Sequence, residues 1–275
     1  MSIIEAILLG AVQGLTEFFP ISSSGHLVFF QHLFGFTEPP IFFDCMVHGG
    51  TLVAILVYLC KDILRLAKDF ALFLASLFTG RKIVEAFEKY PGAWIILLVI
   101  IATVPTCVMG YFFRDYFVFL FGSLRIVGVL WLLNGLILWI TRGIAQGEKV
   151  FTRIKVLDAI LIGIAQGCAI MPGLSRSGLT ISTALFRGFD RQWAVKFSLL
   201  LSIPAIAGAI VLEACNISTS PGSVAPIVAG TLTAAVIGYL TIRFLMRLTR
   251  EGKLFRFAFY SIGIGIVAIA VSFLM

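Results

Sequence analysis

Residues Ala11–His26 read AVQGLTEFFPISSSGH, and residues Ile164–Thr180 read IAQGCAIMPGLSRSGLT. Both stretches interrupt apolar sequence with glycine and polar residues, and they match each other at a constant spacing of 153 residues. The matched pairs are Gln13-Gly14 with Gln166-Gly167, and Ser22-x-Ser24-Gly25 with Ser175-x-Ser177-Gly178. The spacing predicts a diverged duplication in which each half of the chain carries one copy of the motif.

The two copies differ in their charged and polar additions. The first copy carries Glu17 and His26, whereas the second carries Arg176 and Thr180. If the copies meet in space, the two halves therefore bring an acid and a cation to one site.

The composition identifies an integral membrane protein. Of the 275 residues, 60% are hydrophobic and only 13% are charged, against about 25% in soluble domains, and the mean hydropathy is +1.05. Apolar runs near the roughly 20 residues that cross a bilayer predict an all-α polytopic protein with six full transmembrane helices. These runs are Phe42–Cys60, Trp94–Phe113, Leu124–Ile140, Phe197–Leu212, Val224–Leu245 and Phe257–Leu274.

Two other features favour a mature membrane domain with no thiol chemistry. The apolar start at Ile3 has no basic n-region and no small-residue cleavage site, so we expect no removed signal peptide. The five cysteines have no metal-ligand spacing, and we interpret them as packing residues. They are Cys45, Cys60, Cys107, Cys168 and Cys215.

The basic residues predict the topology, because loops rich in Lys and Arg stay cytoplasmic. Eighteen of the 21 basic residues fall into four clusters. The clusters are Lys61, Arg65, Lys68, Arg81, Lys82 and Lys89; Arg142, Lys149, Arg153 and Lys155; Arg187, Arg191 and Lys196; and Arg243, Arg247, Arg250, Lys253 and Arg256. All four clusters are cytoplasmic only if each motif segment leaves the membrane on the side from which it entered.

Each motif is therefore predicted to be a re-entrant helical hairpin. The hairpin Ile3–Phe36 enters from outside, because the loop after it (Glu38, Pro39, Pro40, Asp44) has no cation, and the hairpin Val156–Arg187 enters from the cytoplasm. This arrangement makes one membrane domain of two inverted repeats, about 1–140 and 154–275, with both termini on the outer side.

Two hairpins that break near mid-bilayer can place their loops against each other around a cavity. Pro20 and Pro172 are expected to end the preceding helical stretches, and Gly25 and Gly178 to form tight turns whose backbone N–H groups face an anion. Such turns suit phosphate. The alternative is that the serine, glycine and proline residues only permit close helix packing.

Ionisable groups at membrane depth are costly and commonly functional. Gln13 and Glu17 are four residues apart, so on a helix they face the same way and can share a metal ion or its bound water. Arg176 offers a planar fork of donors that matches phosphate oxygens. The alternative is a plain Glu17–Arg176 ion pair that holds the hairpins together.

Three further side chains are candidates for chemistry. His26 follows the serine run and can serve as general acid or base. Ser23 aligns with Arg176 and is the candidate nucleophile, activated by His26, although a hydroxyl can also only orient water or substrate. His48 opens a Gly49-Gly50-Thr51 turn at the mouth of a crossing, which would place it beside the site or let it cap a helix, and we favour the structural role.

At these residues the chain resembles a known family. QGLTEFFPISSSGH and PGLSRSGLT look like the two signature motifs of the BacA-type undecaprenyl-diphosphate phosphatases, the bacitracin-resistance proteins of bacteria. The length and the order of apolar segments are similar along essentially the whole chain. The resemblance implies an inner-membrane enzyme that removes the terminal phosphate of undecaprenyl diphosphate and so recycles the lipid carrier for peptidoglycan synthesis.

The resemblance also implies roles for residues. The family's acidic motif falls on Gln13 and Glu17, and several members have Glu where this chain has Gln13, which removes one formal charge from a Mg²⁺ or Ca²⁺ site. In the implied mechanism Ser23 or an activated water attacks phosphorus and His26 moves the proton. The expected diphosphate-binding residues are Ser22, Gly25, Ser175, Arg176, Ser177, Gly178 and Thr180.

Two functions compete with this hypothesis. Inverted repeats with broken helices are also the architecture of secondary carriers, so a lipid-phosphate flippase fits the same fold. A carrier needs no nucleophile, and phosphate release from lipid diphosphate would discriminate between the two. A membrane scaffold explains neither the duplicated motifs nor the buried charges. A homodimer is implied by the resemblance alone.

Overall fold

The computed structural model describes residues 1–35, 41–80, 82–113, 116, 120, 123–214 and 224–273. Within these residues the protein is all-helical, with twelve α-helices, three short 3₁₀-helices and no strand. The helices are α1 (Ile3–Thr16), α2 (Ser23–Leu33), α3 (Ile41–Tyr58), α4 (Cys60–Phe78), α5 (Ile83–Lys89), α6 (Pro91–Phe112), α8 (Leu124–Ile140), α9 (Val156–Cys168), α10 (Arg176–Phe186), α11 (Arg191–Ala214), α12 (Val224–Arg250) and α13 (Phe257–Val271).

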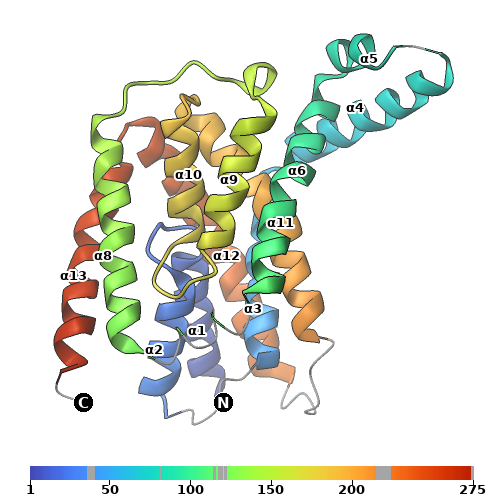
Figure 1. Cartoon of the computed structure of the whole chain (residues 1–275). Helices are drawn as coiled ribbons and strands as arrows, with labels where there is room; N and C mark the ends of the chain where they lie inside the picture. Colours follow the sequence, from blue (N-terminus) through green and yellow to red (C-terminus); the bar gives the residue numbers. More distant parts are fainter. Residues whose placement is uncertain are drawn as a thin grey trace.

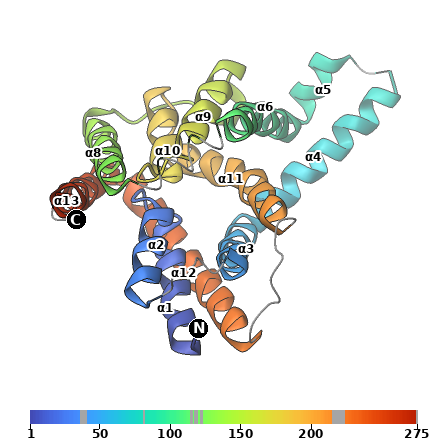
Figure 2. The same ribbon diagram turned by 60° about the horizontal axis from the view of Figure 1, so that its bottom comes forward.

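The predicted crossings are present as helices. Five of them, α6, α8, α11, α12 and α13, are long and apolar enough to cross a membrane. Helices α3 and α4 meet the same criterion together but bend by 74° at their junction, and with this pair taken as one bent span the number is six, as the sequence predicts. Beyond the bend, α4 and α5 extend away from the rest of the bundle (Figure 1, Figure 2).

The two motif segments form pairs of short helices. Helix α1 has 14 residues and α9 has 13, which is too short for a full crossing of about 20 residues. Figure 1 shows α1 and α2 at the end of the molecule that holds both termini, and α9 and α10 at the opposite end. The loops that join the helices of each pair face each other between them. The expected hairpin end at Phe36, and Glu38 to Pro40 of the cation-free loop, lie outside the described residues.

Glycines in the short helices allow their backbones to approach longer helices closely. A Cβ at Gly10 of α1 would overlap the Gly230 carbonyl of α12, and a Cβ at Gly163 of α9 would overlap the Ala102 carbonyl of α6. These two glycines are also 153 residues apart. The register of the duplication therefore extends from the motif to helix packing of the kind that small residues allow in membranes.

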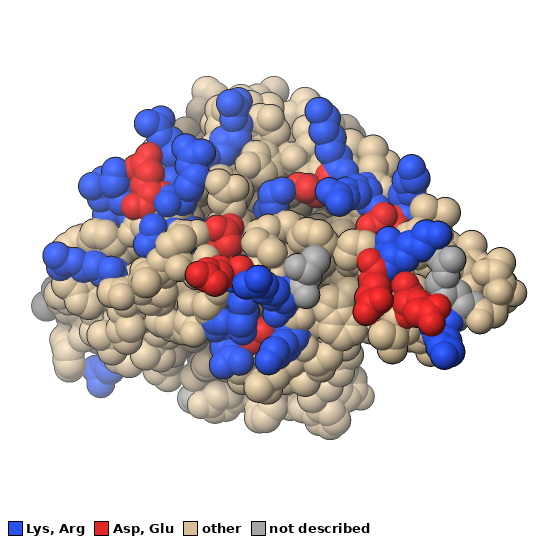
Figure 3. Space-filling view, turned by 90° about the horizontal axis from the view of Figure 1, so that it is seen from above, with Lys and Arg blue, Asp and Glu red and all other residues tan. Residues whose placement is uncertain are grey.

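Basic side chains gather on the end of the bundle opposite the termini. Figure 3 looks onto this end and shows groups of Lys and Arg side chains with acids among them. Asp158, which is fully buried, accepts hydrogen bonds there from Lys149 Nζ at 3.0 Å and from Arg187 Nε at 2.7 Å. The pair with Arg187 joins the start of α9 to the end of α10, and the pair with Lys149 joins the start of α9 to the segment that precedes it.

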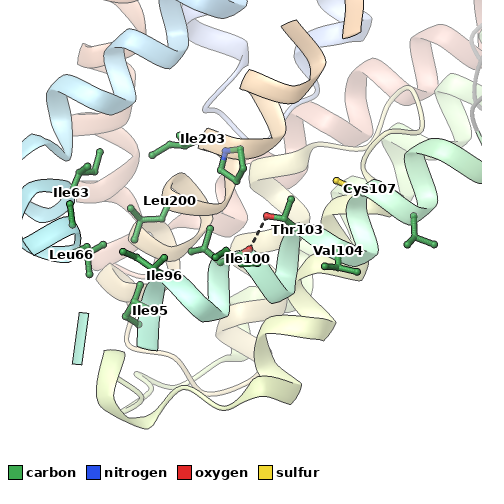
Figure 4. Close-up of a pocket in the computed structure, with 14 residues that line it drawn as sticks. Ile63, Leu66, Ile95, Ile96, Ile100, Thr103, Val104, Cys107, Leu200 and Ile203 are labelled. Carbon is green, nitrogen blue, oxygen red and sulfur yellow. Dashed lines mark hydrogen bonds between the residues drawn. The ribbon is translucent and has the colours of Figure 1, made fainter. Parts of the chain in front are cut away.

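An apolar cavity of about 570 Å³ opens between α4, α6 and α11 (Figure 4). Isoleucine, leucine and valine side chains form most of its wall, among them Ile63, Val99, Leu200 and Ile203, and Thr103 is the hydroxyl residue on it. No phenylalanine lines this cavity.

The close approach of α9 to α6 can be tested with a single methyl group. Gly163→Ala is expected to lower Tm in detergent by several degrees, because overpacking costs about 1–3 kcal/mol. Gly208→Ala in α11 is the matched control, since a Cβ there meets no atom within 4 Å and alanine is the better helix former. Equal melting temperatures for the two variants would contradict the packing described here.

Candidate functional site

The loops of the two hairpins contact each other directly. Arg176 Nη2 donates to Glu17 Oε1 at 2.5 Å. The backbone N–H of Gly173 donates to Ser22 Oγ at 3.3 Å, and Ser175 Oγ donates to the Phe19 carbonyl at 3.5 Å. The duplicated motifs therefore form one centre, to which the first copy brings the acid and the second the cation.

Asn134 of α8 joins the two loops to the bundle. Its Nδ2 donates to the Pro20 carbonyl at 2.9 Å and to Ser261 Oγ at 3.0 Å, and its Oδ1 accepts from the Ser175 N–H at 3.1 Å. The side chain is fully buried. The sequence analysis did not single out Asn134, although a lone amide in an apolar crossing is itself a signal.

Two helix N-termini converge on this centre. Helix α2 begins at Ser23 and α10 at Arg176, and the first N–H groups of a helix have no partner within the helix. Ser175 caps α10 by accepting from the Gly178 N–H at 3.1 Å. The positive ends of two helix dipoles therefore face the place where the loops meet, and this arrangement favours an anion.

The predicted turns at Gly25 and Gly178 are wrong, because both residues lie in the first turn of a helix, α2 and α10 respectively. Their small size serves packing instead: a Cβ at Gly25 would overlap the Trp131 ring, and one at Gly178 would crowd the Pro20 side chain. The left-handed backbone lies at Ser22 (φ 71°) and Gly173 (φ 98°).

Glu17 connects most of the polar groups of the site. Its Oε1 bonds Arg176, whereas its Oε2 accepts from Ser23 Oγ at 2.8 Å and from Gln13 Nε2 at 3.1 Å. The shared helix face of Gln13 and Glu17 agrees with their four-residue spacing. The ion pair with Arg176, which was an alternative in the sequence analysis, is present, and it leaves the second oxygen of the carboxylate to the serine.

The Arg176 guanidinium is only partly satisfied by this pair. Its Nη1 is buried without a hydrogen-bond partner, and buried donors of this kind are rare and need an explanation. The planar fork of Arg176 therefore has one arm on Glu17 and one arm left for an acceptor. A phosphate oxygen matches that arm in charge and geometry.

His26 occupies a different position from the predicted one. Its Nδ1 lies 2.7 Å from the Ser22 carbonyl and its Nε2 lies 2.6 Å from Tyr260 Oη, so both ring nitrogens have partners. The ring stacks on Tyr260 and is 5% exposed. The structure gives Ser23 a hydrogen bond to Glu17 rather than to His26.

The remaining predicted binding hydroxyls are arranged around the loops. Ser177 Oγ lies 3.1 Å from Ser175 Oγ. Thr180 Oγ1 bonds the Arg176 carbonyl at 2.8 Å and lies 2.6 Å from Ser198 Oγ. The Thr180 hydroxyl therefore connects α10 to α11, and the structure places it in packing rather than at the carboxylate.

His48, which the sequence analysis set aside, lies beside Glu17. Its Nε2 is 3.9 Å from Glu17 Oε2, and its Nδ1 is 2.7 Å from the Asp44 carbonyl, with the side chain one-third exposed. The backbone carbonyl accepts from Nδ1, so Nε2 is the ring nitrogen that lies nearer the carboxylate. The position beside the site, which was the less favoured alternative from the sequence, is therefore the one that the structure shows.

A divalent cation would have a mixed set of donors here. Within the described residues no three His, Cys, Asp or Glu side chains gather as metal ligands. However, Gln13 Oε1 is fully buried and has no hydrogen-bond partner, next to the Glu17 carboxylate. Amide and carboxylate oxygens are ligands that Mg²⁺ and Ca²⁺ accept, so these two residues fit the ion predicted from the sequence.

The fold and the site define a polytopic α-helical membrane protein in which the loops of two short helix pairs form a buried polar centre. The chain belongs to the family described as bacitracin resistance protein BacA, whose model matches residues 6–267. It is 42% identical to an undecaprenyl-diphosphatase of Carboxydothermus hydrogenoformans over 94% of both chains. It is also 40% identical to an undecaprenyl-diphosphatase of Alkaliphilus metalliredigens over the full length of both chains. It is 38% identical to an undecaprenyl-diphosphatase of Methanosphaera stadtmanae over 99% of both chains.

The Asn134 contacts predict a large effect of one buried amide. Asn134→Leu would orphan the Ser175 N–H and the Pro20 carbonyl, at about 1–3 kcal/mol for each buried group, and is expected to lower Tm by several degrees. Ser261→Ala removes only one of the three bonds and is expected to lower Tm less. Thermal unfolding in detergent compares the two, and an Asn134→Leu protein as stable as wild type would contradict the bridging role.

Proposed function

We infer that this protein is an undecaprenyl-diphosphatase, which hydrolyses the terminal phosphate of undecaprenyl diphosphate to give undecaprenyl phosphate. The observation that carries the inference is the Glu17 carboxylate, which holds an arginine on one oxygen and a serine hydroxyl on the other. This arrangement pairs a phosphate binder with a nucleophile. The relatives described above bear the same activity in their names.

The diphosphate is bound, in this proposal, by the second motif. Arg176 contributes its unpaired Nη1, and the first N–H groups of α10 contribute their dipoles. Preorganised donors of this kind provide most of the rate enhancement in phosphoryl transfer. Ser22, Ser175 and Ser177 lie around the same loops and orient the phosphates.

Ser23 is the proposed nucleophile and Glu17 its base. As Ser23 Oγ forms a bond to the terminal phosphorus, its proton passes along the 2.8 Å hydrogen bond to Glu17 Oε2. The bridging P–O bond breaks, and undecaprenyl phosphate leaves with the electron pair. Water then cleaves the phosphoserine, and Ser23 recovers a proton from Glu17. His26 positions the start of α2 through the Ser22 carbonyl and Tyr260.

We propose that Glu17 and Gln13 hold a divalent cation, for which Mg²⁺ and Ca²⁺ are the ions predicted from the sequence. When bound, the ion would offset the negative charge of the diphosphate. Gln13 would present its amide oxygen, which is buried without a partner.

The two repeats are proposed to be inverted in the bacterial inner membrane, with the lysine- and arginine-rich end in the cytoplasm. The termini lie at the opposite end of the bundle (Figure 1) and are placed on the outer side. The isoprenoid tail remains in lipid while the diphosphate enters the loops. Hydrolysis there returns the carrier to peptidoglycan synthesis and opposes bacitracin. A homodimer is part of this proposal.

The flippase alternative is less well supported. A carrier requires an anion site between inverted hairpins but no hydroxyl hydrogen-bonded to a buried base, and the Ser23–Glu17 bond is such a pair. The curated relatives are also named for hydrolysis rather than for transport.

The proposal is tested by phosphate release from undecaprenyl diphosphate in detergent. Arg176→Lys keeps the charge but loses the planar fork, and Glu17→Gln loses the base; each is expected to reduce kcat/KM by about 10²–10³-fold, the cost of removing one preorganised donor. Arg153→Lys, in an exposed ion pair at the cationic end, is the control with unchanged activity. Wild type that moves lipid diphosphate without releasing phosphate would favour the carrier.

The orientation is tested by labelling of single cysteines in a chain whose own cysteines are replaced. Ser2→Cys is expected to react with a membrane-impermeant maleimide in intact cells whose outer membrane, if present, is permeabilised. Glu148→Cys, on a side chain that is 89% exposed, is expected to react only after the inner membrane is opened. The reverse pattern would invert the proposed topology.

A further inference from the structure

His48 is the one histidine whose ring faces the Glu17 carboxylate among the residues that the structure describes. Its Nε2 lies 3.9 Å from Glu17 Oε2, which is longer than a hydrogen bond. The two atoms are therefore close to each other without a hydrogen bond between them. Glu17 Oε1 is turned the other way, onto Arg176, so the carboxylate separates the arginine from the histidine.

The surroundings of His48 resemble those of a metal ligand. Metal-binding histidines usually donate their other ring N–H to a carbonyl or carboxylate, which fixes the tautomer and the ring orientation. His48 Nδ1 meets this condition, because it lies 2.7 Å from the Asp44 carbonyl. The same residue is held on its side chain by Gln31, whose Nε2 donates to Asp44 Oδ1 at 2.7 Å.

The donor atoms also lie at distances that one ion can bridge. With metal–ligand bonds of about 2.0–2.2 Å, a single ion joins atoms up to about 4.2 Å apart. The 3.9 Å between His48 Nε2 and Glu17 Oε2 is within this limit. Gln13 adds a buried oxygen that has no other partner.

We propose that His48 is a ligand of the divalent cation at Glu17, and that its imidazole makes the site prefer Mn²⁺ over Ca²⁺. A nitrogen donor favours first-row transition ions, whereas Ca²⁺ binds oxygen ligands almost exclusively. This inference rests on the proposed function and deepens it, because it names a ligand and an ion preference for the same site. It also adds a third donor to Glu17, the single carboxylate, and the neutral Gln13.

The test is binding of Mn²⁺ to the purified full-length protein, followed by electron paramagnetic resonance. Bound Mn²⁺ is expected to show hyperfine coupling to a nitrogen nucleus, and the coupling is expected to change when the protein carries ¹⁵N-labelled histidine. Labelling needs no substitution, so this measurement stands even if a variant fails to fold. Mn²⁺ bound without histidine nitrogen coupling, or no Mn²⁺ binding at all, would overturn the proposal.

Variants then assign the nitrogen. His48→Ala is expected to lose the coupling and to weaken Mn²⁺ binding by at least about tenfold, with a smaller loss for Ca²⁺. Glu17→Gln is expected to weaken the binding of both ions. Glu148→Gln, at an exposed surface acid, is expected to leave the binding of both ions unchanged. Wild-type Mn²⁺ affinity and coupling in His48→Ala would overturn the proposal, as would wild-type affinity in Glu17→Gln.

Phosphate release by the wild type is measured separately, so that the two proposals can fail independently. Nitrogen-coupled Mn²⁺ without phosphate release would leave the ligand assignment standing and remove the phosphatase function. Phosphate release together with Mn²⁺ that has no histidine coupling would support the phosphatase function and overturn the ligand assignment.

Discussion

The buried contact between Glu17 and Arg176 is the interaction on which the rest of the site depends. A single charge at membrane depth is expensive, and removing one partner of a buried pair leaves the other uncompensated. Each hairpin therefore needs the other, because one holds the acid and the other the cation. The two copies of the motif supply the two loops, and their differences in sequence supply the opposite charges.

The lengths of the short helices place this contact in the middle of the bundle. Helices α1 and α9 have only 14 and 13 residues and lie at opposite ends of the molecule (Figure 1), so the loops that follow them meet between the two ends. Exposed backbone at that depth must find partners within the protein. Asn134 supplies several of them, since it pairs with a carbonyl of one loop and an N–H of the other. Close glycine packing at Gly10 and Gly163 then sets the depth of each hairpin.

Much of this architecture could be predicted from the sequence. Apolar runs located the crossings, the 153-residue register located the duplicated loops, and the four-residue spacing of Gln13 and Glu17 placed them on one helix face. The prediction of turns at Gly25 and Gly178 was wrong, because the sequence does not distinguish a glycine in the first turn of a helix from a glycine in a loop. Asn134, His48 and Tyr260 could not be placed, since their partners come from distant helices and depend on how the bundle packs.

The two oxygens of the Glu17 carboxylate have different partners, and this difference relates the fold to the proposed chemistry. Glu17 Oε1 accepts from Arg176 of the other hairpin, and Glu17 Oε2 accepts from Ser23 of its own hairpin. In the proposed reaction the arginine binds phosphate and the serine attacks it, so that reaction would require the two halves to be assembled. The same contact thus stabilises the fold and prepares the reaction.

The most direct test of a single phosphate site shared by two hairpins is an experimental structure with an undecaprenyl diphosphate analogue whose bridging oxygen is replaced by a methylene group. The account predicts that the terminal phosphonate contacts Arg176 Nη1 and lies against Ser23 Oγ, with the lipid tail leading out into the bilayer. A phosphonate bound elsewhere, such as at the lysine- and arginine-rich end, with Ser23 and Arg176 contacting only Glu17, would contradict it.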